Sequence, residues 1–438
     1  MSSGSSQVIA RSTPAEVARI RGNTRRGKGV LCPPYRVLHV LPDLAMAGGQ
    51  QVVLRSIARL DRSRVECHVC YFRPPAELAS QFVKAGVTPR LIEHRGWWST
   101  PRVLAQLVKT IRLHRIDAVH VHGTPVDKFY GQAAALVCGL PVVRTIHGMK
   151  PPRPSLRDLL RRPRPRFAFR WVRQIRQAVL DRVMDRWTVR RVVTVSEAVF
   201  ESWAAYLKSL GISADQITVS YNGVPVDEYA GLRPPEELHN LRRALGIEDA
   251  FPVLINVGRL SPGKGQDLLV PMLQTLLRSW PKAKLLIVGE GEYRPGLQER
   301  IDQSGLNGRI QLLGCRADVP ALLSVSDVFV FSSHFEGFPL SVLEAMASAT
   351  PVVSFELPGL SQLIQEGING YLVRQRSPEL LARFVGKAIE DPERARQMGR
   401  EAQSLVKDRY DVGHSVKALE TVYGSLLGNS EPTNSRHK

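Results

Sequence analysis

Two glutamates with seven residues between them mark the most informative stretch of this 438-residue chain. Glu336 lies among turn-forming residues, whereas Glu344 lies in an apolar run that repeats at helical spacing from Leu340 to Ala347. Pro339 suits the first turn of such a helix. We therefore expect Glu336 on a loop and Glu344 about one turn inside a helix.

The start of this helix is suited to binding a phosphate group. The first N–H groups of a helix have no acceptor within the helix, and the positive end of its dipole attracts an anion. Acids on either side could bind the hydroxyls of the molecule that carries the phosphate. The spacing therefore suits a nucleotide sugar, although an ordinary strand–loop–helix unit with two solvated glutamates has the same spacing.

A second motif follows the apolar run at 252–258. Residues 258–265 read GRLSPGKG, and we expect Arg259 and Lys264 to project into a cleft and neutralise a diphosphate without metal. The same stretch partly matches the phosphate-binding loop of nucleotide hydrolases, G-x-x-x-x-G-K-[ST]. Because its last position is Gly265, the hydroxyl that would hold Mg²⁺ is missing. A nucleotide hydrolase remains an alternative.

Other glycines and two histidines follow expected strands. Gly289, Glu290 and Gly291 could let a base or ribose lie against the backbone, and no D-x-D triplet suggests a metal site. Gly48 and Gly49 allow close approach of a ligand to a helix start. His122 and His147 each end a strand and precede a glycine. They could contact a sugar, and hydrogen-bonded loop histidines would look the same.

Bulk properties narrow the class of protein. The length calls for two or three domains, and the 43% hydrophobic residues support large cores. No apolar run is long enough to cross a bilayer, and the N-terminus lacks an apolar secretion signal. Five scattered cysteines suit a reducing cytosol. Cys67 and Cys70 lie in an expected strand that points them to opposite faces, which favours a core role.

Much of the net charge of +20 is concentrated in one segment. Residues 150–191 contain fourteen lysines and arginines against three acids, with Trp171, Trp187 and other apolar residues between them. This composition is typical of a basic amphipathic segment on anionic lipid, which we expect as a partner. A solvated arginine-rich helix is the main alternative. A polyanionic acceptor fits less well, and we expect no nucleic acid partner.

Short apolar runs alternate with helical patterns, which predicts parallel sheets covered by helices on both faces. The expected strands lie near 35–41, 65–71, 89–92, 117–121, 141–146, 191–195, 217–220, 252–258, 283–289, 309–313, 327–331, 351–354 and 370–373. Prolines and charges interrupt the pattern around 226–250, the expected linker between two doubly wound domains. The carboxyl ends of both sheets should face one cleft.

The predicted organisation has two tails, two domains and a final helix. Its parts are a disordered tail at 1–32, an N-terminal acceptor domain at 33–228, a C-terminal donor domain at 229–411, a helix at 412–427 that crosses back to the N-terminal domain, and a disordered tail at 428–438.

In combination, these motifs resemble those of glycosyltransferase family 4, retaining enzymes with the α/β GT-B fold. The resemblance covers about residues 35–425. It rests on residues 258–265 and 289–291, on Glu336 with Glu344, and on residues 366–373, which read EGINGYLV. Weaker matches are Val195-Ser196-Glu197 and Asn222-Gly223-Val224.

The resemblance implies roles for individual residues. Arg259 and Lys264 would hold the donor diphosphate, Glu336 would contact the donor sugar at the reacting face, and Glu344 would bind the ribose hydroxyls. His147 would lie near the transferred sugar. The other implied donor-site residues are Gly289, Glu290, Gly337, Phe338, Leu340 and Ser341, with Gly48 and Gly49 approaching the phosphate and the acceptor. Where the family often has glutamate after the glycine pair, this chain has Gln51.

The resemblance and the charges predict one reaction. A sugar would pass, with retained configuration, from a UDP-sugar or, as the next choice, GDP-mannose to a lipid-linked or glycan acceptor in surface polysaccharide or glycolipid biosynthesis. No cofactor or metal is expected, and the enzyme would be cytoplasmic, on the inner face of the membrane. A glycosidase pair is disfavoured because Glu344 lies inside a helix. A catalytically silent nucleotide-sugar-binding protein is a further alternative, and the oligomeric state is left open.

Overall fold

The computed structural model describes residues 33–123, 125–150, 179–231 and 233–428. The expected N-terminal tail, most of the expected C-terminal tail and much of the basic segment lie outside them. Among the described residues, none of the helices combines the length and the apolar character that crossing a membrane requires.

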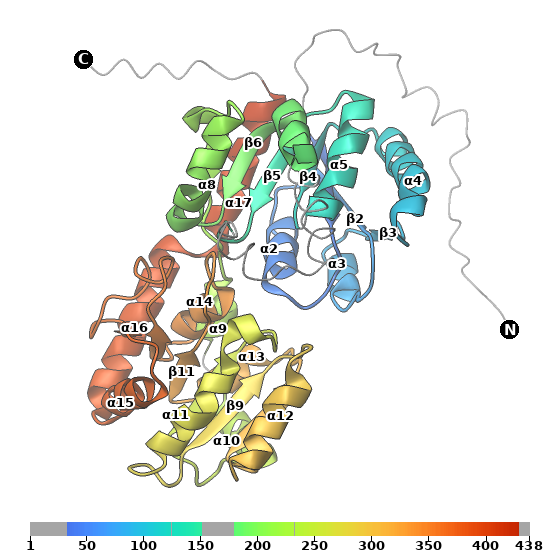
Figure 1. Cartoon of the computed structure of the whole chain (residues 1–438). Helices are drawn as coiled ribbons and strands as arrows, with labels where there is room; N and C mark the ends of the chain where they lie inside the picture. Colours follow the sequence, from blue (N-terminus) through green and yellow to red (C-terminus); the bar gives the residue numbers. More distant parts are fainter. Residues whose placement is uncertain (1–32, 124, 151–178, 232, 429–438) are drawn as a thin grey trace, which may run out of the picture.

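Two parallel sheets form the frame of the molecule (Figure 1). The first sheet has the order β3-β2-β1-β4-β5-β6-β7. Its strands are β1 Tyr35–Leu41, β2 Val65–Tyr71, β3 Arg90–Leu91, β4 Ala118–Val121, β5 Val142–Ile146, β6 Val189–Thr194 and β7 Ile217–Val219. The second sheet has the order β10-β9-β8-β11-β12-β13. Its strands are β8 Val253–Val257, β9 Lys284–Val288, β10 Ile310–Gly314, β11 Val328–Phe331, β12 Val352–Phe355 and β13 Tyr371–Val373.

Helices connect the strands and cover the sheets (Figure 1). Those that precede the second sheet are α2 Gly48–Ile57, α3 Ala79–Lys84, α4 Thr100–Leu113, α5 Pro125–Cys138, α8 Glu197–Ser209, α9 Val226–Ala230 and α10 Pro235–Ala244. Those that follow are α11 Leu269–Leu276, α12 Arg294–Gln303, α13 Val319–Ser324, α14 Leu340–Ala347, α15 Pro378–Ile389, α16 Pro392–Arg409 and α17 Val412–Leu427. Each sheet with its covering helices is called the first or the second domain below.

The strands lie where the apolar runs predicted them, and the doubly wound α/β class is confirmed. Parallel strands buried on both faces are continuous apolar runs, and every residue of β4, β11 and β12 is buried. The two cysteines of β2 contribute to different apolar clusters, so they point to opposite faces. Burial raises the pKa of both thiols to about 12.

The strand order reverses direction once in each sheet, between β1 and β4 and between β8 and β11. Ligands of doubly wound sheets bind at such switch points, beyond the carboxyl ends of the strands. The loops in question precede α2 and follow β4 in the first domain, and they follow β8 and β11 in the second. Most of the predicted site residues lie on these four loops and on the helices that begin there, whereas His147 follows β5 and Gly289 follows β9.

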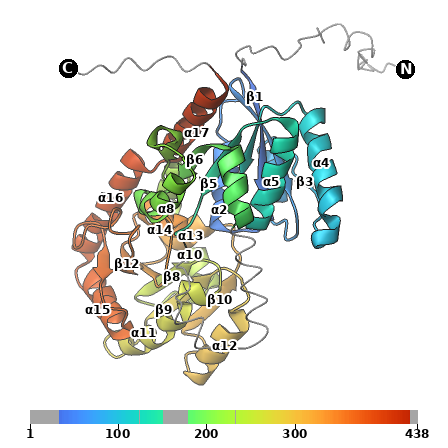
Figure 2. The ribbon, with the colours of Figure 1, turned by 45° about the horizontal axis from the view of Figure 1, so that its top comes forward.

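The chain crosses between the domains twice, at adjacent places. The N–H of Val224 donates to the carbonyl of Tyr410 at 3.0 Å, and the N–H of Val412 donates to the carbonyl of Val224 at 3.0 Å. After the second crossing, α17 packs on the first domain while α16 stays beside the second (Figure 2). Apolar side chains of α17 share one cluster with residues of β1, β2, β4, β5 and β6.

The stretch expected as a linker, 226–250, contains the helices α9 and α10. α9 packs on α14 and α16, and α10 packs on α13. Pro235 occupies the start of α10, two glutamates follow in its first turn and two arginines lie in its last turn. This order complements the helix dipole, so the prolines and charges that suggested a linker belong to a helix.

A buried ionic cluster fixes the described end of the basic segment. Asp185, fully buried in the helical stretch 179–188, accepts hydrogen bonds from Arg144 at 2.6 Å, Tyr206 at 2.7 Å and Lys128 at 3.1 Å. Burial opposes the charge of Asp185, but Arg144 and Lys128 outweigh it and hold the pKa of its carboxyl below the usual range. Residues 179–188 are thereby attached to α5, β5 and α8.

Candidate active site

Lys264 and Glu336 form an ion pair where β8 and β11 end. Lys264 closes the short 3₁₀ turn Pro262–Lys264, and its Nζ donates to Glu336 Oε1 at 2.6 Å. Ser333 Oγ donates to the same carboxylate oxygen at 2.6 Å. The Glu336 side chain is only 14% exposed. The structure thus brings together two of the predicted catalytic residues, with the carboxylate neutralised by the lysine.

The loop that carries Glu336 is held by Arg376, a residue that the sequence analysis missed. The Arg376 guanidinium donates to the carbonyls of Ser332 at 2.8 Å and Ser333 at 2.7 Å. It lies over the ring of Phe355 with its Cζ atom 4.7 Å from the ring centre, and burial lowers the pKa of Arg376. Because Arg376 follows β13, only the packing of β13 beside β12 brings it to this loop.

Arg259 lies at the same end of the second sheet as Lys264, but it is paired with a different carboxylate. Its Nη2 donates to Glu292 Oε2 at 2.8 Å, and both side chains are more than half exposed. Glu290 is paired with Arg294 in the same way, at 2.7 Å. Arg259 and Lys264, expected as two cations facing a diphosphate, are therefore each bound to a different carboxylate.

Gly289 is required by the turn that places these groups. Its φ is +136°, and a Cβ atom there would lie 2.1 Å from the carbonyl oxygen of Gly258. The backbones after β8 and β9 thus touch, and any larger residue would push the loop of Arg259 away.

The predicted helix after Glu336 is α14, which begins at Leu340 after the extended Pro339. Glu344 lies one turn inside it and is buried, whereas Ser341 in the first turn is half-buried. Phe338 is buried just before the helix. The first-turn N–H groups, expected to receive a phosphate, therefore lie directly after Gly337 and Phe338.

The first domain approaches α14 through its own glycines and His147. A Cβ atom at Gly48 would lie 4.0 Å from Leu340, and one at Gly49 would lie 3.8 Å from the ring of His147. A Cβ atom at Gly337 would lie 2.3 Å from the carbonyl oxygen of His147, so only glycine fits there. The helix starts of α2 and α14, from different domains, therefore lie close to each other.

Two polar side chains of the first domain bind the backbone before α14. Ser196 caps α8 by accepting from the N–H of Val199, and its Oγ donates to the carbonyl of Gly337 at 2.9 Å. Asn222 Nδ2 donates to the carbonyl of Phe338 at 2.7 Å. Both residues lie in the weaker sequence matches, which thus mark contacts between the domains.

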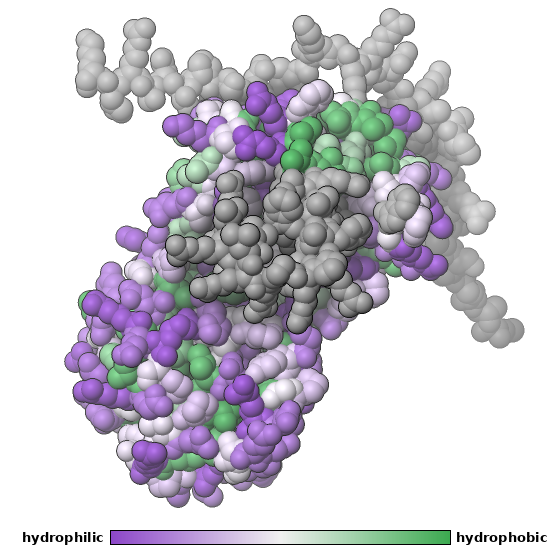
Figure 3. Space-filling view, in the orientation of Figure 1, coloured by the Kyte–Doolittle hydropathy of each residue, from purple (hydrophilic) through white to green (hydrophobic). Residues whose placement is uncertain are grey.

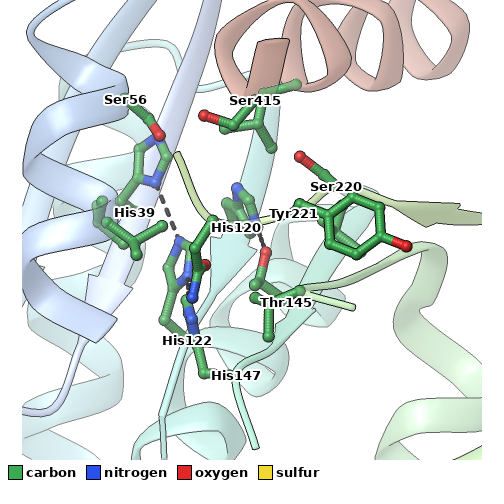
Figure 4. Close-up of a pocket in the computed structure, with 15 residues that line it drawn as sticks. His39, Ser56, His120, His122, Thr145, His147, Ser220, Tyr221 and Ser415 are labelled. Carbon is green, nitrogen blue, oxygen red and sulfur yellow. Dashed lines mark hydrogen bonds between the residues drawn. The ribbon is translucent and has the colours of Figure 1, made fainter. Parts of the chain in front are cut away.

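His147 is the outer member of a chain of histidines (Figure 4). Its Nε2 lies 3.2 Å from His122 Nδ1, and His122 Nε2 lies 3.2 Å from His39 Nδ1. His120, beside them, is bound to the hydroxyls of Tyr423 at 2.6 Å and Thr145 at 2.7 Å. These rings line a small cavity of about 30 Å³.

Burial keeps these imidazoles neutral. It lowers the pKa of His39 to about 3 and that of His147 to about 4, and those of His120 and His122 lie well below the usual value. His147 is half-buried overall, but its Nδ1 is inside the protein and has no hydrogen-bond partner in the described part of the chain. At neutral pH, His147 therefore offers the cleft an uncharged ring and a backbone carbonyl, not a cation.

Three of these rings, His39, His120 and His122, have nitrogens within 4.8 Å of one another, close enough to share a metal ion. In the described residues, however, both nitrogens of His120 and both of His122 already have hydrogen-bond partners. Only His39 Nε2 is without one. The arrangement therefore favours a hydrogen-bonded cluster of histidines over a metal site.

The buried histidines predict that acid weakens the fold. An unfolded histidine binds a proton below pH about 6.5, whereas folded His39 does so only near pH 3, so stability falls as pH decreases between these values. We expect His39→Asn to lower the slope of unfolding free energy against pH by about 1.4 kcal/mol per pH unit between about pH 4 and 6. Denaturant unfolding at several pH values measures this slope. The matched control is His239→Asn, which replaces an exposed histidine. An unchanged slope in His39→Asn would contradict the conclusion that His39 is neutral in the folded protein.

Arg55 is the second important residue that the sequence analysis missed. From α2 in the first domain, its Nη2 donates to Glu344 Oε1 at 2.6 Å. The two residues are 289 positions apart in the chain, and no spacing rule connects them. The carboxylate expected to bind a ribose is thus already bound by a cation from the other domain.

Comparisons with known proteins match both halves of the chain. The family described as Glycosyltransferase Family 4 matches residues 47–228, and the one described as Glycosyl transferases group 1 matches residues 239–405. Among individual relatives, an Escherichia coli protein named UDP-Gal:alpha-D-GlcNAc-diphosphoundecaprenol alpha-1,3-galactosyltransferase is 23% identical over 90% of this chain and 98% of its own length. The alpha-D-kanosaminyltransferase of Streptomyces kanamyceticus is 26% identical over 76% of this chain and 83% of its own.

A solved structure has the same fold. HepE from Anabaena, in complex with UDP-glucose, superposes with a TM-score of 0.74 at 23% identity, covering 89% of this chain and all of that one.

Proposed function

Because this chain belongs to the group 1 glycosyltransferases of family 4 and has their GT-B fold, as predicted, we propose that it transfers a sugar from a nucleoside-diphosphate sugar with retained configuration and without metal. The acceptor in this proposal is a lipid-linked or glycan molecule. The observation that supports it most directly is the Lys264–Glu336 ion pair, which lies beside the start of α14 where Gly48 and His147 of the first domain approach.

The charges of the site suit the departure of a nucleoside diphosphate. As the bond between the sugar carbon and the phosphate oxygen breaks, negative charge gathers on the phosphate. Lys264, Arg259 and the N–H groups at the start of α14 oppose that charge. The acceptor oxygen then bonds to the sugar carbon on the face that the phosphate leaves, and its proton passes to the departing phosphate oxygen.

Glu336 has a separate part in this proposal. Glu336 neutralises Lys264 in the structure, and a diphosphate would compete for that lysine. Glu336 is then free to bind the hydroxyls of the donor sugar. His147, neutral and facing Gly49, would supply its backbone and ring to the same sugar.

The relatives favour a UDP-sugar. The name of the Escherichia coli relative begins with UDP-Gal and includes a diphosphoundecaprenol acceptor, and HepE was solved with UDP-glucose. GDP-mannose is our second choice of donor. A lipid-linked acceptor would agree with a cytoplasmic enzyme at the inner face of a membrane that makes surface polysaccharide or glycolipid.

Calorimetric titration of UDP, GDP and ADP in EDTA tests the proposal. We expect one nucleotide to bind without metal and its affinity to fall at least about tenfold in Lys264→Ala, because a charge-assisted contact contributes about 1.5–3 kcal/mol. Binding only in the presence of Mg²⁺ would favour the nucleotide hydrolase instead. Binding with no turnover of any nucleotide sugar would favour a silent binding protein.

We also propose that the described end of the basic segment contacts an anionic membrane. Val179, Val183 and Trp187 are exposed at successive turns of the helical stretch 179–188, opposite the buried Asp185, with Arg182 and Arg186 exposed between them. Figure 3 shows apolar surface gathered over this end of the first domain. An apolar face flanked by arginines is typical of contact with lipid headgroups.

The membrane proposal predicts binding to vesicles that contain phosphatidylglycerol, stronger at low salt, and weak binding to pure phosphatidylcholine. Trp187→Ser should weaken binding about tenfold or more, because burial of such a ring contributes about 1.5–3 kcal/mol. Leu113→Ser, which alters an exposed apolar residue on α4, is the control. Equal co-sedimentation with both kinds of vesicle would contradict the proposal.

A further inference from the structure

The carboxylate of Glu344 is held by side chains from two other elements. Arg55 of α2 donates to it at 2.6 Å, and the side chains of Arg55 and Glu344 are 14% and 8% exposed. The same Nη2 atom of Arg55 lies 3.0 Å from the hydroxyl of Tyr229 in α9 and 3.1 Å from Gln51 Oε1. Because α2 covers the first sheet and α14 the second, this ion pair crosses between the domains.

Burial makes the partners of Glu344 interdependent. It disfavours the charged guanidinium, but the attraction of Glu344 outweighs it and raises the pKa of Arg55. Burial also raises the pKa of Tyr229, with Glu344 beside it, so the phenol stays protonated. The cluster is therefore an ionised pair with one neutral hydroxyl, enclosed between the domains.

The cluster leaves capacity for a ligand. A carboxylate has about four acceptor positions, and the hydrogen bond from Arg55 occupies one of them. Arg55 Nη1 is buried with no hydrogen-bond partner among the described residues. A buried donor without an acceptor costs about 1–3 kcal/mol, so a polar ligand beside Glu344 would relieve it.

We propose that Arg55 is a positioning residue that holds the Glu344 carboxylate in place for the ribose of the donor, so that recognition of the ribose hydroxyls requires both domains. The inference rests on the proposed function and on the contact with the ribose that the family resemblance implies for Glu344. Arg55 does not need to leave when the nucleotide binds, because the carboxylate accepts both partners at once.

The test compares nucleotides with and without a ribose hydroxyl. Calorimetry of UDP and dUDP, and of GDP and dGDP, gives the dissociation constant of each nucleotide. The measured ratio is the dissociation constant of the deoxyribonucleotide divided by that of the ribonucleotide. We expect a ratio of about ten or more in the wild type, since a hydrogen bond to a charged group contributes about 1.5–3 kcal/mol. In Arg55→Met the ratio should fall towards one, chiefly because the ribonucleotide binds more weakly, and Arg55→Lys should restore part of it.

A pH series separates positioning from general damage. Arg55 and Tyr229 are the titratable groups that contact Glu344, and the side chain that α16 directs to the end of α14 is the neutral Gln403. Without Arg55, a buried carboxyl takes up a proton more readily and loses its value as an acceptor. The ratio in Arg55→Met should therefore rise with pH, whereas the wild-type ratio stays constant between about pH 6 and 9.

Arg59 provides the matched control. It lies in the turn just after α2, four residues beyond Arg55, and makes the same kind of contact, at 2.6 Å to Glu228 of α9, but it is exposed and its carboxylate partner is not Glu344. Arg59→Met should leave the ratio unchanged. A wild-type ratio in Arg55→Met would overturn the role of Arg55. Failure of the proposed function looks different: no nucleotide would bind at all, which would overturn both proposals. A wild-type ratio in Glu344→Gln would overturn only the assignment of the ribose to Glu344.

Discussion

Replacing Lys264 with alanine is expected to lower kcat by about 100- to 1000-fold, the usual loss when one group that stabilises developing negative charge is removed. Lys264 is bound directly to Glu336, so its loss also leaves a carboxylate that is only 14% exposed without its cation. That carboxylate would repel the departing diphosphate. Both effects act on the same step and in the same direction.

The rate can be measured without knowing the acceptor. Slow transfer of the sugar to water releases the nucleoside diphosphate, and a panel of UDP-glucose, UDP-galactose and GDP-mannose reports this release. The control is Lys282→Ala. Lys282 is exposed just before the amino end of β9, at the opposite end of the same sheet, so this variant should keep full activity. A Lys264→Ala enzyme within about threefold of the wild type would remove Lys264 from the mechanism.

Replacing Asp185 with alanine should destabilise the protein by about 3–5 kcal/mol, the cost of leaving buried cations without their partner. Asp185 is fully buried, and Lys128 and Arg144 around it are nearly so. Denaturant unfolding measures the loss, and Asp215→Ala, an exposed aspartate of the same domain, should change the free energy of unfolding very little.

A double substitution distinguishes charge from packing. Lys128→Met together with Asp185→Asn removes one cation and the anion at once, and it should recover part of the stability that Asp185→Asn alone loses. If the double variant is no more stable than Asp185→Asn, the unpaired charge of Lys128 is not the cause of the loss. The ionic cluster around Asp185 also holds residues 179–188 in place. Loss of vesicle binding in Asp185→Ala would therefore indicate that membrane contact depends on this cluster.

Local patterns were sufficient to predict the strands and α14. A parallel strand covered on both faces is a continuous apolar run, and a proline before an apolar run of helical spacing marks a helix start. Proline and charge predicted a linker over 226–250 but not its helices, of which α10 begins with Pro235. Two glutamates in its first turn and two arginines in its last were the signals of a helix.

The candidate site was predictable only where its residues share a loop or a motif. Lys264 and Glu336 each belong to a motif, whereas Arg55, Arg376 and His39 do not. His39 lies beside His120 only through the register of β1 and β4, which no rule of local sequence supplies. Arg55 and Arg376 bind their partners across long chain separations, so their contacts depend on the packing of complete domains.

The return of the chain to the first domain has a consequence for protein engineering. Because α17 completes the core around β1 and β6, the first domain is assembled from two separate pieces of sequence, and the second domain is an insert between Val224 and Asp411. A chimera that takes its donor-binding half from a relative must therefore be spliced at both of these positions. A fusion with a single junction would place a foreign helix against the first sheet and remove the hydroxyl of Tyr423 from His120.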